Sequence, residues 1–408
     1  REDDRRLFSN PPKLNIIALQ DSQLERLDAF SQDLASTSIA QADLKELLDL
    51  FEHASTFGSL IQIPQAFAKK LPDLESKLNE ALESGDIFAQ QSAQELLPLV
   101  QQAKILAKKY DAVIANPPYM GGKGMNAALK DFAKKQFPDS KSDLFAMFIE
   151  RGFAWCKDSG FNSMVTMQSW MFLSSYEVMR EKILQDRTIQ TMAHLGARAF
   201  PEISGEVVQA TAFVMQGTYL NGFKPVFFRL VDTTQDSKEV ELQAGLNRFD
   251  STIQDDFKKI PGSPVAYWVS PSVLKCFAEN TCLSSFAVAK SGQNTGDNNR
   301  FIKLWSEVNN NKIGFNYTTL AETENGHKFY PYNKGGEYRK WYGNFEYVIN
   351  WENNGREIKE YAVKRNNGKH WSRYIQNLDL MFKEGVTWTF ISSSYFGARY
   401  TPKGHLFD

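Results

Sequence analysis

Apolar positions along the chain fall into short β-branched runs and longer stretches with helical spacing. Residues 13–19 predict a buried strand that ends at Asp21, and residues 22–109 predict a helical insertion broken near Pro64 and Pro72. The continuous apolar run at 110–115 predicts a strand buried on both faces. Helices over 142–155 and 176–184 and strands over 163–166, 189–195 and 209–216 follow. This alternation predicts a largely parallel sheet covered by helices.

The residue composition changes towards the end of the chain. The polar stretch 232–251 is typical of an exposed connection, and from residue 287 aromatic, Gly and Asn residues predict an irregular α+β domain with long loops. We therefore divide the chain into the end of an upstream sheet (1–21), a helical insertion (22–109), an α/β core (110–235), a connecting region (236–286) and a C-terminal domain (287–408).

Composition restricts the class of protein. With 42% hydrophobic and 23% charged residues, the 408-residue chain is typical of a globular protein with two or three cores. It has no apolar run long enough to cross a membrane and no apolar signal-peptide core, so we expect a cytoplasmic protein without a membrane partner. The three cysteines show no CxxC spacing, which argues against a disulfide framework. The five histidines are scattered along the chain, so the sequence does not favour a metal site either.

Charge is unevenly distributed although the net charge is −1. Residues 22–105 carry 6 Lys or Arg against 13 Asp or Glu, whereas residues 287–408 carry 17 against 12 and hold five of the eight tryptophans. A polyanionic partner would therefore bind the C-terminal third.

The clearest chemical signal is Asn116-Pro117-Pro118-Tyr119, directly after the apolar run 110–115. Open α/β sheets bind ligands at the carboxyl ends of their strands. An amino group on an aromatic ring is a poor nucleophile, and two acceptors that hold its hydrogens favour the reactive geometry. The Asn116 side-chain oxygen and the Pro117 carbonyl supply two acceptors, and the two prolines stiffen the turn. Tyr119 offers a flat ring on which a base rotated out of a duplex can stack.

Asn116-Pro117-Pro118-Tyr119 resembles motif IV of the amino-methyltransferases. Residues 116–126 and 138–148 resemble the adenine-specific DNA methyltransferases of bacterial phage-exclusion (BREX) systems, and so do residues 291–301 and 331–344. Segments similar to Thr295-Gly296-Asp297-Asn298 recur in restriction enzymes that fuse methylation to cleavage. The resemblance implies a partial Rossmann-like α/β sheet, S-adenosylmethionine as cofactor, double-stranded DNA as substrate and other BREX subunits as partners.

The same resemblance assigns roles to further residues. It implies that Asp21 lies near the adenine of the cofactor and that Phe200 covers the second side of the flipped base. It also implies that residues 287–408 begin a target-recognition domain, in which basic and amide side chains have the chemistry to contact DNA: Asn294, Asn298, Arg300, Lys334, Arg339 and Lys340. The glycine-rich cofactor loop of the family would lie before this chain, so we expect the chain to be part of a longer protein.

Two other functions fit the same motifs. Enzymes that methylate a protein glutamine or an RNA base also carry Asn-Pro-Pro-Tyr, but they are usually smaller and lack a C-terminal segment like 295–301. A non-catalytic DNA-recognition or scaffold subunit of a phage-defence complex would keep the motif without using it. Site-specific adenine methylation is the function that the sequence favours most.

Overall fold

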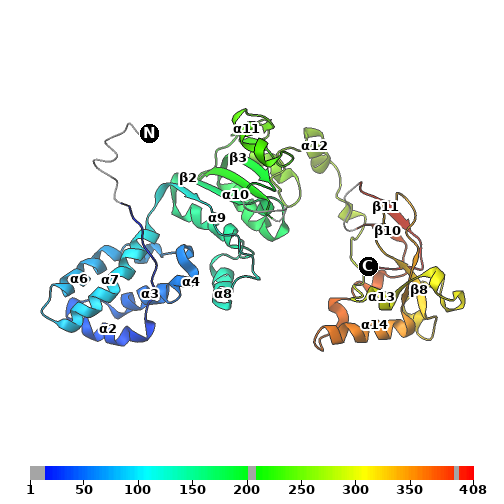
Figure 1. Ribbon diagram of the computed structural model, residues 1–408, viewed down its shortest axis with the longest axis horizontal. Helices are drawn as coiled ribbons and strands as arrows, with labels where there is room; N and C mark the ends of the chain where they lie inside the picture. The colour runs from blue at the N-terminus through cyan, green and yellow to red at the C-terminus, as the bar shows by residue number, and fades with distance from the viewer. Residues whose placement is uncertain (1–13, 201–207, 390–394) are drawn as a thin grey trace. The chain divides into compact units, whose positions relative to one another are not determined.

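The computed structural model describes residues 14–200, 208–389 and 395–408. The chain divides into two compact units, residues 1–281 and 282–408, and each is described by itself. The first unit contains a helical part followed by a mixed sheet, and the second contains small sheets and a helix (Figure 1). The predicted α/β class is confirmed.

The helical part has its own apolar core, built from leucine, alanine and phenylalanine side chains at helical spacing. Its helices are α2 (Leu27–Asp33), α3 (Gln41–Phe51), α4 (Ala54–Phe57), α5 (Gln65–Ala68), α6 (Leu71–Leu82) and α7 (Ile87–Ala107). Pro64 precedes α5 and Pro72 lies in the first turn of α6, where a missing N–H costs little. The two prolines therefore mark helix starts, as predicted.

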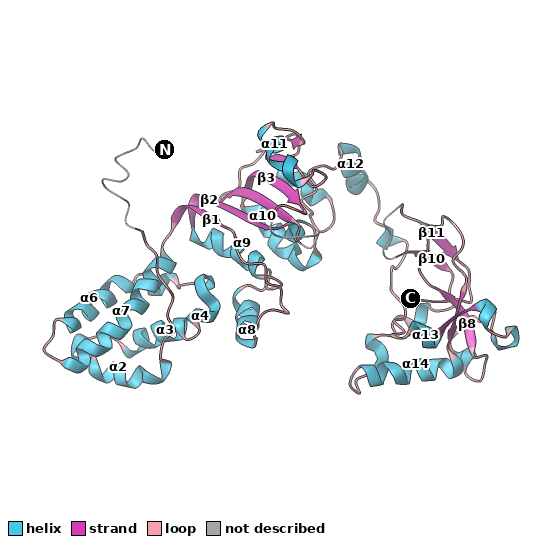
Figure 2. Cartoon of the chain, in the orientation of Figure 1, coloured by secondary structure: helices cyan, strands magenta, loops and turns pink. Residues whose placement is uncertain are grey.

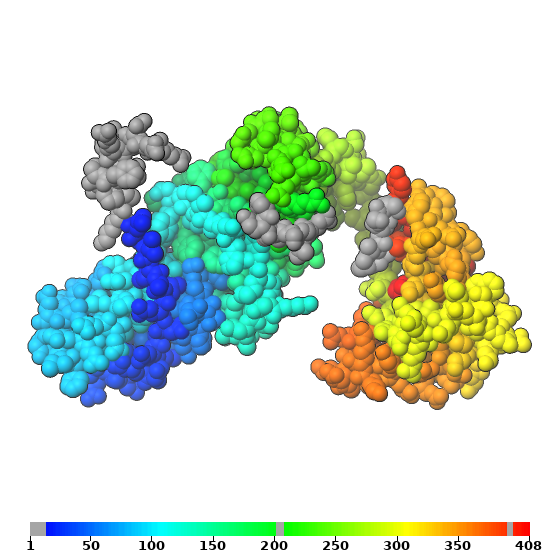
Figure 3. Space-filling model, viewed as in Figure 1, coloured from blue at the N-terminus to red at the C-terminus, as the bar shows by residue number. Residues whose placement is uncertain are grey.

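The strand predicted at residues 13–19 does not form in the part that the structure describes. Residues 14–20 are extended without strand pairing, and Leu14 and Ile16 are 71% and 83% exposed. This segment lies on the surface of the helical part, where its dark-blue atoms stand out (Figure 3). A strand needs a neighbour for its main-chain groups, and here only Gln102 supplies one, through two 3.0 Å hydrogen bonds with the main chain of Gln20.

The sheet of the first unit has six strands in the order β1-β2-β4-β3-β5-β6. They are β1 (Tyr110–Ala115), β2 (Cys156–Met167), β3 (Thr188–Gly196), β4 (Ala210–Gln216), β5 (Val226–Arg229) and β6 (Arg248–Phe249). The prediction of a largely parallel sheet needs correction, because β4 runs antiparallel to both of its neighbours and β6 runs antiparallel to β5. β1, β2, β3 and β5 point the same way, so their carboxyl ends share one edge, called the carboxyl edge below.

The strand β1 has the predicted bounds but not the predicted burial. It lies at the end of the six-stranded sheet, and Ile114 is 81% exposed. Its apolar sequence was taken to indicate burial of both faces, whereas Ala112 and Ile114 are exposed in the described part of the chain. β2 pairs with β1 among the described residues.

Helices α9 (Leu144–Trp155) and α10 (Glu177–Asp186) pack on the sheet in one apolar core (Figure 2). The remaining helices of this unit are α8 (Ala127–Gln136), α11 (Gln235–Gln243) and α12 (Pro271–Glu279). Residues 232–251, expected to be an exposed connection, contain α11 and the strand β6 instead. Phe257, Val265 and Tyr267 then join the core of the sheet, so much of the predicted connecting region 236–286 belongs to this unit.

The second unit is built around a four-stranded sheet in the order β12-β8-β9-β7 and a pair of strands, β10 and β11. Their bounds are β7 (Ile302–Leu304), β8 (Phe329–Asn333), β9 (Tyr347–Asn350), β10 (Gly385–Trp388), β11 (Ala398–Thr401) and β12 (Leu406–Phe407). The helices are α13 (Asn298–Phe301) and α14 (Glu352–Arg365). Aromatic side chains such as Tyr330, Tyr332 and Trp351 fill the core, which agrees with the predicted irregular α+β character.

Candidate active site

Asn116 to Tyr119 begin directly after β1 and therefore lie at the carboxyl edge of the sheet. Pro117 is buried, whereas Asn116 and Pro118 are exposed and Tyr119 is half-buried. The turn is thus anchored through one proline while the asparagine amide faces solvent. A planar amino group can reach the Asn116 side chain without rearrangement of the core.

Tyr119 is fixed at both ends of its side chain. Its hydroxyl donates a hydrogen bond to the Val165 carbonyl of β2 at 3.3 Å, and its ring meets that of Phe145 edge to face at 6.1 Å between centroids. Burial raises the pKa of the Tyr119 hydroxyl, so the group stays protonated near neutral pH. Tyr119 is therefore held in a fixed orientation with a protonated hydroxyl, and its stacking role stays a prediction.

Asp143 holds the loop that follows Tyr119. Its carboxylate accepts hydrogen bonds from the main-chain N–H of Met120 at 2.9 Å and from that of Phe145 at 3.4 Å, the latter as N-cap of α9. The Leu144 N–H donates in return to the Met120 carbonyl at 3.2 Å. Burial raises the pKa of the Asp143 carboxyl, against the lowering effect of these N–H groups. Sequence reasoning assigned no role to Asp143, although its place at the start of an apolar helix pattern was a signal for an N-cap.

A second polar group lies farther along the carboxyl edge. His194 of β3 contacts the Gln168 side-chain oxygen through Nε2 at 2.6 Å and the Tyr267 hydroxyl through Nδ1 at 3.1 Å. Burial, with the nearby charges of Arg229 and Lys238, lowers the pKa of His194 to about 4. His194 is therefore neutral near pH 7, and its two ring nitrogens connect β3 to Gln168, directly after β2, and to Tyr267.

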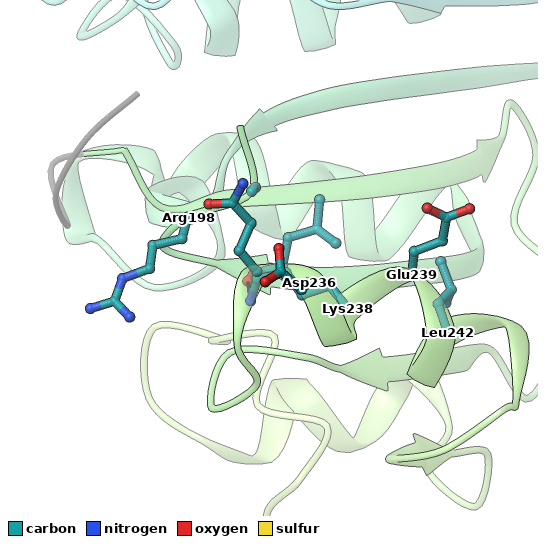
Figure 4. Close-up of a pocket in the computed structure, with 8 residues that line it drawn as sticks. Arg198, Asp236, Lys238, Glu239 and Leu242 are labelled. Carbon is teal, nitrogen blue, oxygen red and sulfur yellow. Dashed lines mark hydrogen bonds between the residues drawn. The ribbon is translucent and has the colours of Figure 1, made fainter. Parts of the chain in front are cut away.

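A cavity of about 540 Å³ opens at the end of β3 beside α11 (Figure 4). Its lining mixes both charges and does not include the Asn116 turn: Leu195, Arg198, Ala199, Gln235, Asp236, Lys238, Glu239 and Leu242. The Lys238 ammonium donates to the main-chain carbonyls of Leu195, Leu230 and Thr233, and its burial lowers the pKa of the amine. All three N–H donors of Lys238 thus serve the fold around the strand ends.

Two residues assigned by resemblance lie in the first unit. Both carboxylate oxygens of Asp21 accept hydrogen bonds from Ser55, from its N–H and its hydroxyl at 2.7 Å each, and these bonds lower the Asp21 pKa. In this arrangement Asp21 is hydrogen-bonded to the first turn of the short helix α4, and its cofactor role stays a prediction. Phe200 is half-buried and follows β3 at the carboxyl edge, with residues 201–207 outside the described part.

The six residues assigned to DNA in the second unit fall into two groups. Asn294, Asn298 and Arg300 are engaged within the unit: Asn294 accepts from Arg365 at 3.2 Å, Asn298 accepts from the Thr295 hydroxyl at 2.5 Å, and Arg300 pairs with Glu357 at 2.7 Å. Lys334, Arg339 and Lys340 belong to the segment between β8 and β9. Arg339 lies 3.9 Å from Glu346 with its side chain 53% exposed, and Lys340 is exposed.

No set of three or more His, Cys, Asp or Glu side chains in the described ranges is arranged to hold a metal ion. Within the same ranges, no helix combines the length and apolar character needed to span a membrane.

Residues 20–200 match the family model of the Eco57I restriction-modification methylase. The chain is also similar to an adenine-specific methyltransferase BrxX from Escherichia coli O9:H4 (strain HS), at 46% identity over 429 aligned residues. It is 40% identical over 423 residues to an adenine-specific methyltransferase PglX from Lacticaseibacillus casei (strain Zhang). Each alignment covers 100% of this chain and 34% of the relative, so the chain spans about a third of the length of these proteins.

The chain is therefore a relative of adenine-specific methyltransferases over its whole length, which confirms the resemblance found in its motifs. Among solved structures, the DNA complex of the Type IIL restriction-modification enzyme MmeI aligns with 95% of this chain and 61% of that chain, at 12% identity and a TM-score of 0.44.

Proposed function

We propose that the protein to which this chain belongs transfers a methyl group from S-adenosylmethionine to the exocyclic amino nitrogen of an adenine in duplex DNA, within a bacterial phage-defence system. The names of the relatives support this proposal, since both are adenine-specific methyltransferases. The structural observation that carries it is the exposed Asn116 amide beside the buried Pro117, at the carboxyl end of β1.

The turn can hold an adenine amino group through two acceptors. The Asn116 side-chain oxygen takes one N–H and the Pro117 carbonyl takes the other, which draws the amino nitrogen out of conjugation with the ring. Proline at positions 117 and 118 removes two main-chain N–H donors that would compete for the same acceptors. The half-buried Tyr119 ring, tethered to β2, gives the base a surface for stacking.

The described residues supply the adenine side of this site and do not supply a complete cofactor site. S-adenosylmethionine would provide the electrophilic methyl group when bound. Asp21, the residue assigned to it, has both carboxylate oxygens hydrogen-bonded to Ser55.

Methylation of DNA by the intact protein tests the proposal. Asn116→Ala should reduce adenine methylation by roughly 100- to 1,000-fold, the usual effect of removing one preorganised polar contact from a reacting group. Asn221→Ala is the matched control, because Asn221 is also exposed but follows β4, at the opposite edge of the sheet. Equal methylation by wild type and Asn116→Ala would overturn the catalytic assignment.

A further inference from the structure

The loop 337–344 of the second unit is bonded to β11. The Trp341 N–H donates to the Ala398 carbonyl at 2.8 Å, and the Tyr400 N–H donates to the Trp341 carbonyl at 2.8 Å. Trp341 thus pairs with Arg399 of β11 through a one-residue parallel bridge. Its side chain is nevertheless 75% exposed, so the main chain is held firmly while the indole ring remains in solvent.

The main chain of Trp341 is strained. Its φ is +73°, a value that bulky aromatic residues rarely adopt. The surroundings impose this conformation, since the Asn344 amide closes the loop by donating to the Glu337 carbonyl at 3.1 Å. A Cβ at Gly397 would lie 2.7 Å from the Arg339 carbonyl, so the loop also sits close against the start of β11. Strained conformations of this kind cluster at active sites and ligand-binding sites.

Other large exposed side chains surround Trp341 on the loop and on the segments 386–388 and 395–400. We call this set the aromatic surface: Tyr338, Trp341, Tyr342, Val386, Trp388, Tyr395, Phe396 and Tyr400. Two pairs within this set are neighbours: the rings of Tyr338 and Tyr395 lie 6.0 Å apart, and Val386 faces Tyr400 across the strand pair. An exposed apolar surface of this extent indicates a binding site.

The charge beside the aromatic surface selects one class of partner. Residues 334–344 carry three cations, Lys334, Arg339 and Lys340, against one acid, Glu337. Cations interleaved with exposed aromatic rings suit nucleic acid, because the cations meet phosphates while the rings stack on bases.

We propose that Trp341 stacks on an unpaired or everted base of bound DNA, while Arg339 and Lys340 contact the flanking phosphates. The inference rests on the proposed function in taking DNA as the partner, and it adds the residue that grips an unstacked base in the second unit. It also gives a reason for the strained conformation, which keeps the ring out of the core of the unit.

Trp341→Asn tests the inference without disturbing the fold, since asparagine tolerates positive φ and lacks the aromatic ring. The probes are two fluorescein-labelled 30-base-pair duplexes of mixed sequence, one fully paired and one with a single unpaired adenine. The intact wild-type protein should bind the second on the order of tenfold more tightly, the scale of one base–aromatic stack. Trp341→Asn should lose this preference and unfold at the same or a higher temperature, whereas Trp341→Phe should keep part of the preference.

Lys340→Gln provides the matched control, because it removes a charge and keeps the ring. It should weaken binding to both duplexes equally and preserve their ratio. A Trp341→Asn protein with the wild-type ratio would overturn this inference and leave adenine methylation untouched. A wild-type protein that binds neither duplex would overturn the inference together with the DNA substrate of the proposed function.

Discussion

The Asp143 carboxylate accepts a hydrogen bond from the Met120 main-chain N–H at 2.9 Å, and this contact ties the residue after the Asn116–Tyr119 turn to the first turn of α9. The turn is therefore held from two sides, by β1 before it and by Asp143 after it. Positioning of this kind matters because small displacements of a reacting group cost large factors in rate.

We expect Asp143→Ala to lower the kcat of adenine methylation by about 10- to 100-fold, because the turn loses its second anchor. The dissociation constant for DNA should stay near that of wild type, and the free energy of unfolding should fall by about 1 kcal/mol through loss of the N-cap. Asp143→Asn keeps an acceptor oxygen and should restore most of the kcat. The control is Asp131→Ala, on α8, whose exposed carboxylate pairs only with Lys134. An unchanged kcat in Asp143→Ala would refute the positioning role.

His194 should make stability depend on pH. Its folded pKa of about 4 lies below the ordinary value of 6.5, so between these values the unfolded chain binds a proton that the folded chain does not. The contribution of neutral His194 to stability is complete above pH 6.5 and is lost as the pH falls towards 4. Over that window we expect a loss on the order of 2–3 kcal/mol.

Urea unfolding at pH 7 and pH 5, compared between wild type and His194→Gln, measures this contribution. His194→Gln lacks the titrating group and should show a smaller decrease in unfolding free energy between the two pH values. The comparison uses the pH slope, so a general destabilisation by the substitution does not obscure it. An identical slope in both proteins would show that His194 already titrates normally in the fold.

Arg151 connects the helical part to the sheet. This buried side chain on α9 donates to the carbonyls of Ser59, Ile61 and Leu106 at 2.7 to 3.1 Å, and burial lowers its pKa to about 10. Arg151→Lys replaces the guanidinium, whose Nε and Nη2 atoms reach the three carbonyls from two positions, with one ammonium on a different stem, and we expect it to lower the free energy of unfolding by about 2–4 kcal/mol. Lys157→Ala, which removes an exposed ion pair with Asp111, should cost less than about 1 kcal/mol. Comparable losses in the two variants, measured by urea unfolding, would contradict this role.

The position of the candidate site could be predicted from the sequence because local chemistry determines it. An apolar β-branched run followed by Asn116 and two prolines can only be a strand that stops at a rigid turn, and β1 has the predicted bounds. The contact of Asp143 with Met120 could not be predicted, since it joins residues 23 positions apart and depends on how α9 packs.

The incorrect predictions of strand burial and strand direction have one physical origin. Both properties depend on which other elements pack on a strand or pair with it. The apolar pattern indicated that Ile114 and Ile16 would be covered, but this cover comes from elements packed on the strand, which no local pattern specifies. The antiparallel direction of β4 escaped prediction for the same reason, because the residues 197–209 between β3 and β4 do not reveal that the chain reverses within the sheet. In the second unit, Arg300 was assigned to DNA by residue type, while its ion pair with Glu357 required the fold.

The ion pair between Arg300 and Glu357 distinguishes Arg300 from the exposed cations Arg339 and Lys340 of the second unit. Arg339 and Lys340 are exposed, and the ion pair between Arg339 and Glu346 is long, at 3.9 Å. Arg300, in contrast, is bonded to Glu357 through two nitrogens at 2.7 and 2.9 Å. If Arg339 and Lys340 contact phosphates, replacing both with glutamine should weaken DNA binding. The logarithm of the binding constant should then fall less steeply with the logarithm of the salt concentration, with a slope smaller by roughly 1–2. Arg300→Gln should leave that slope unchanged, because its charge is already neutralised locally. Fluorescence anisotropy with the intact protein between low and moderate salt measures both. A slope that changes with Arg300 and not with the Arg339 and Lys340 pair would move the DNA contact to α13 and reverse the assignment.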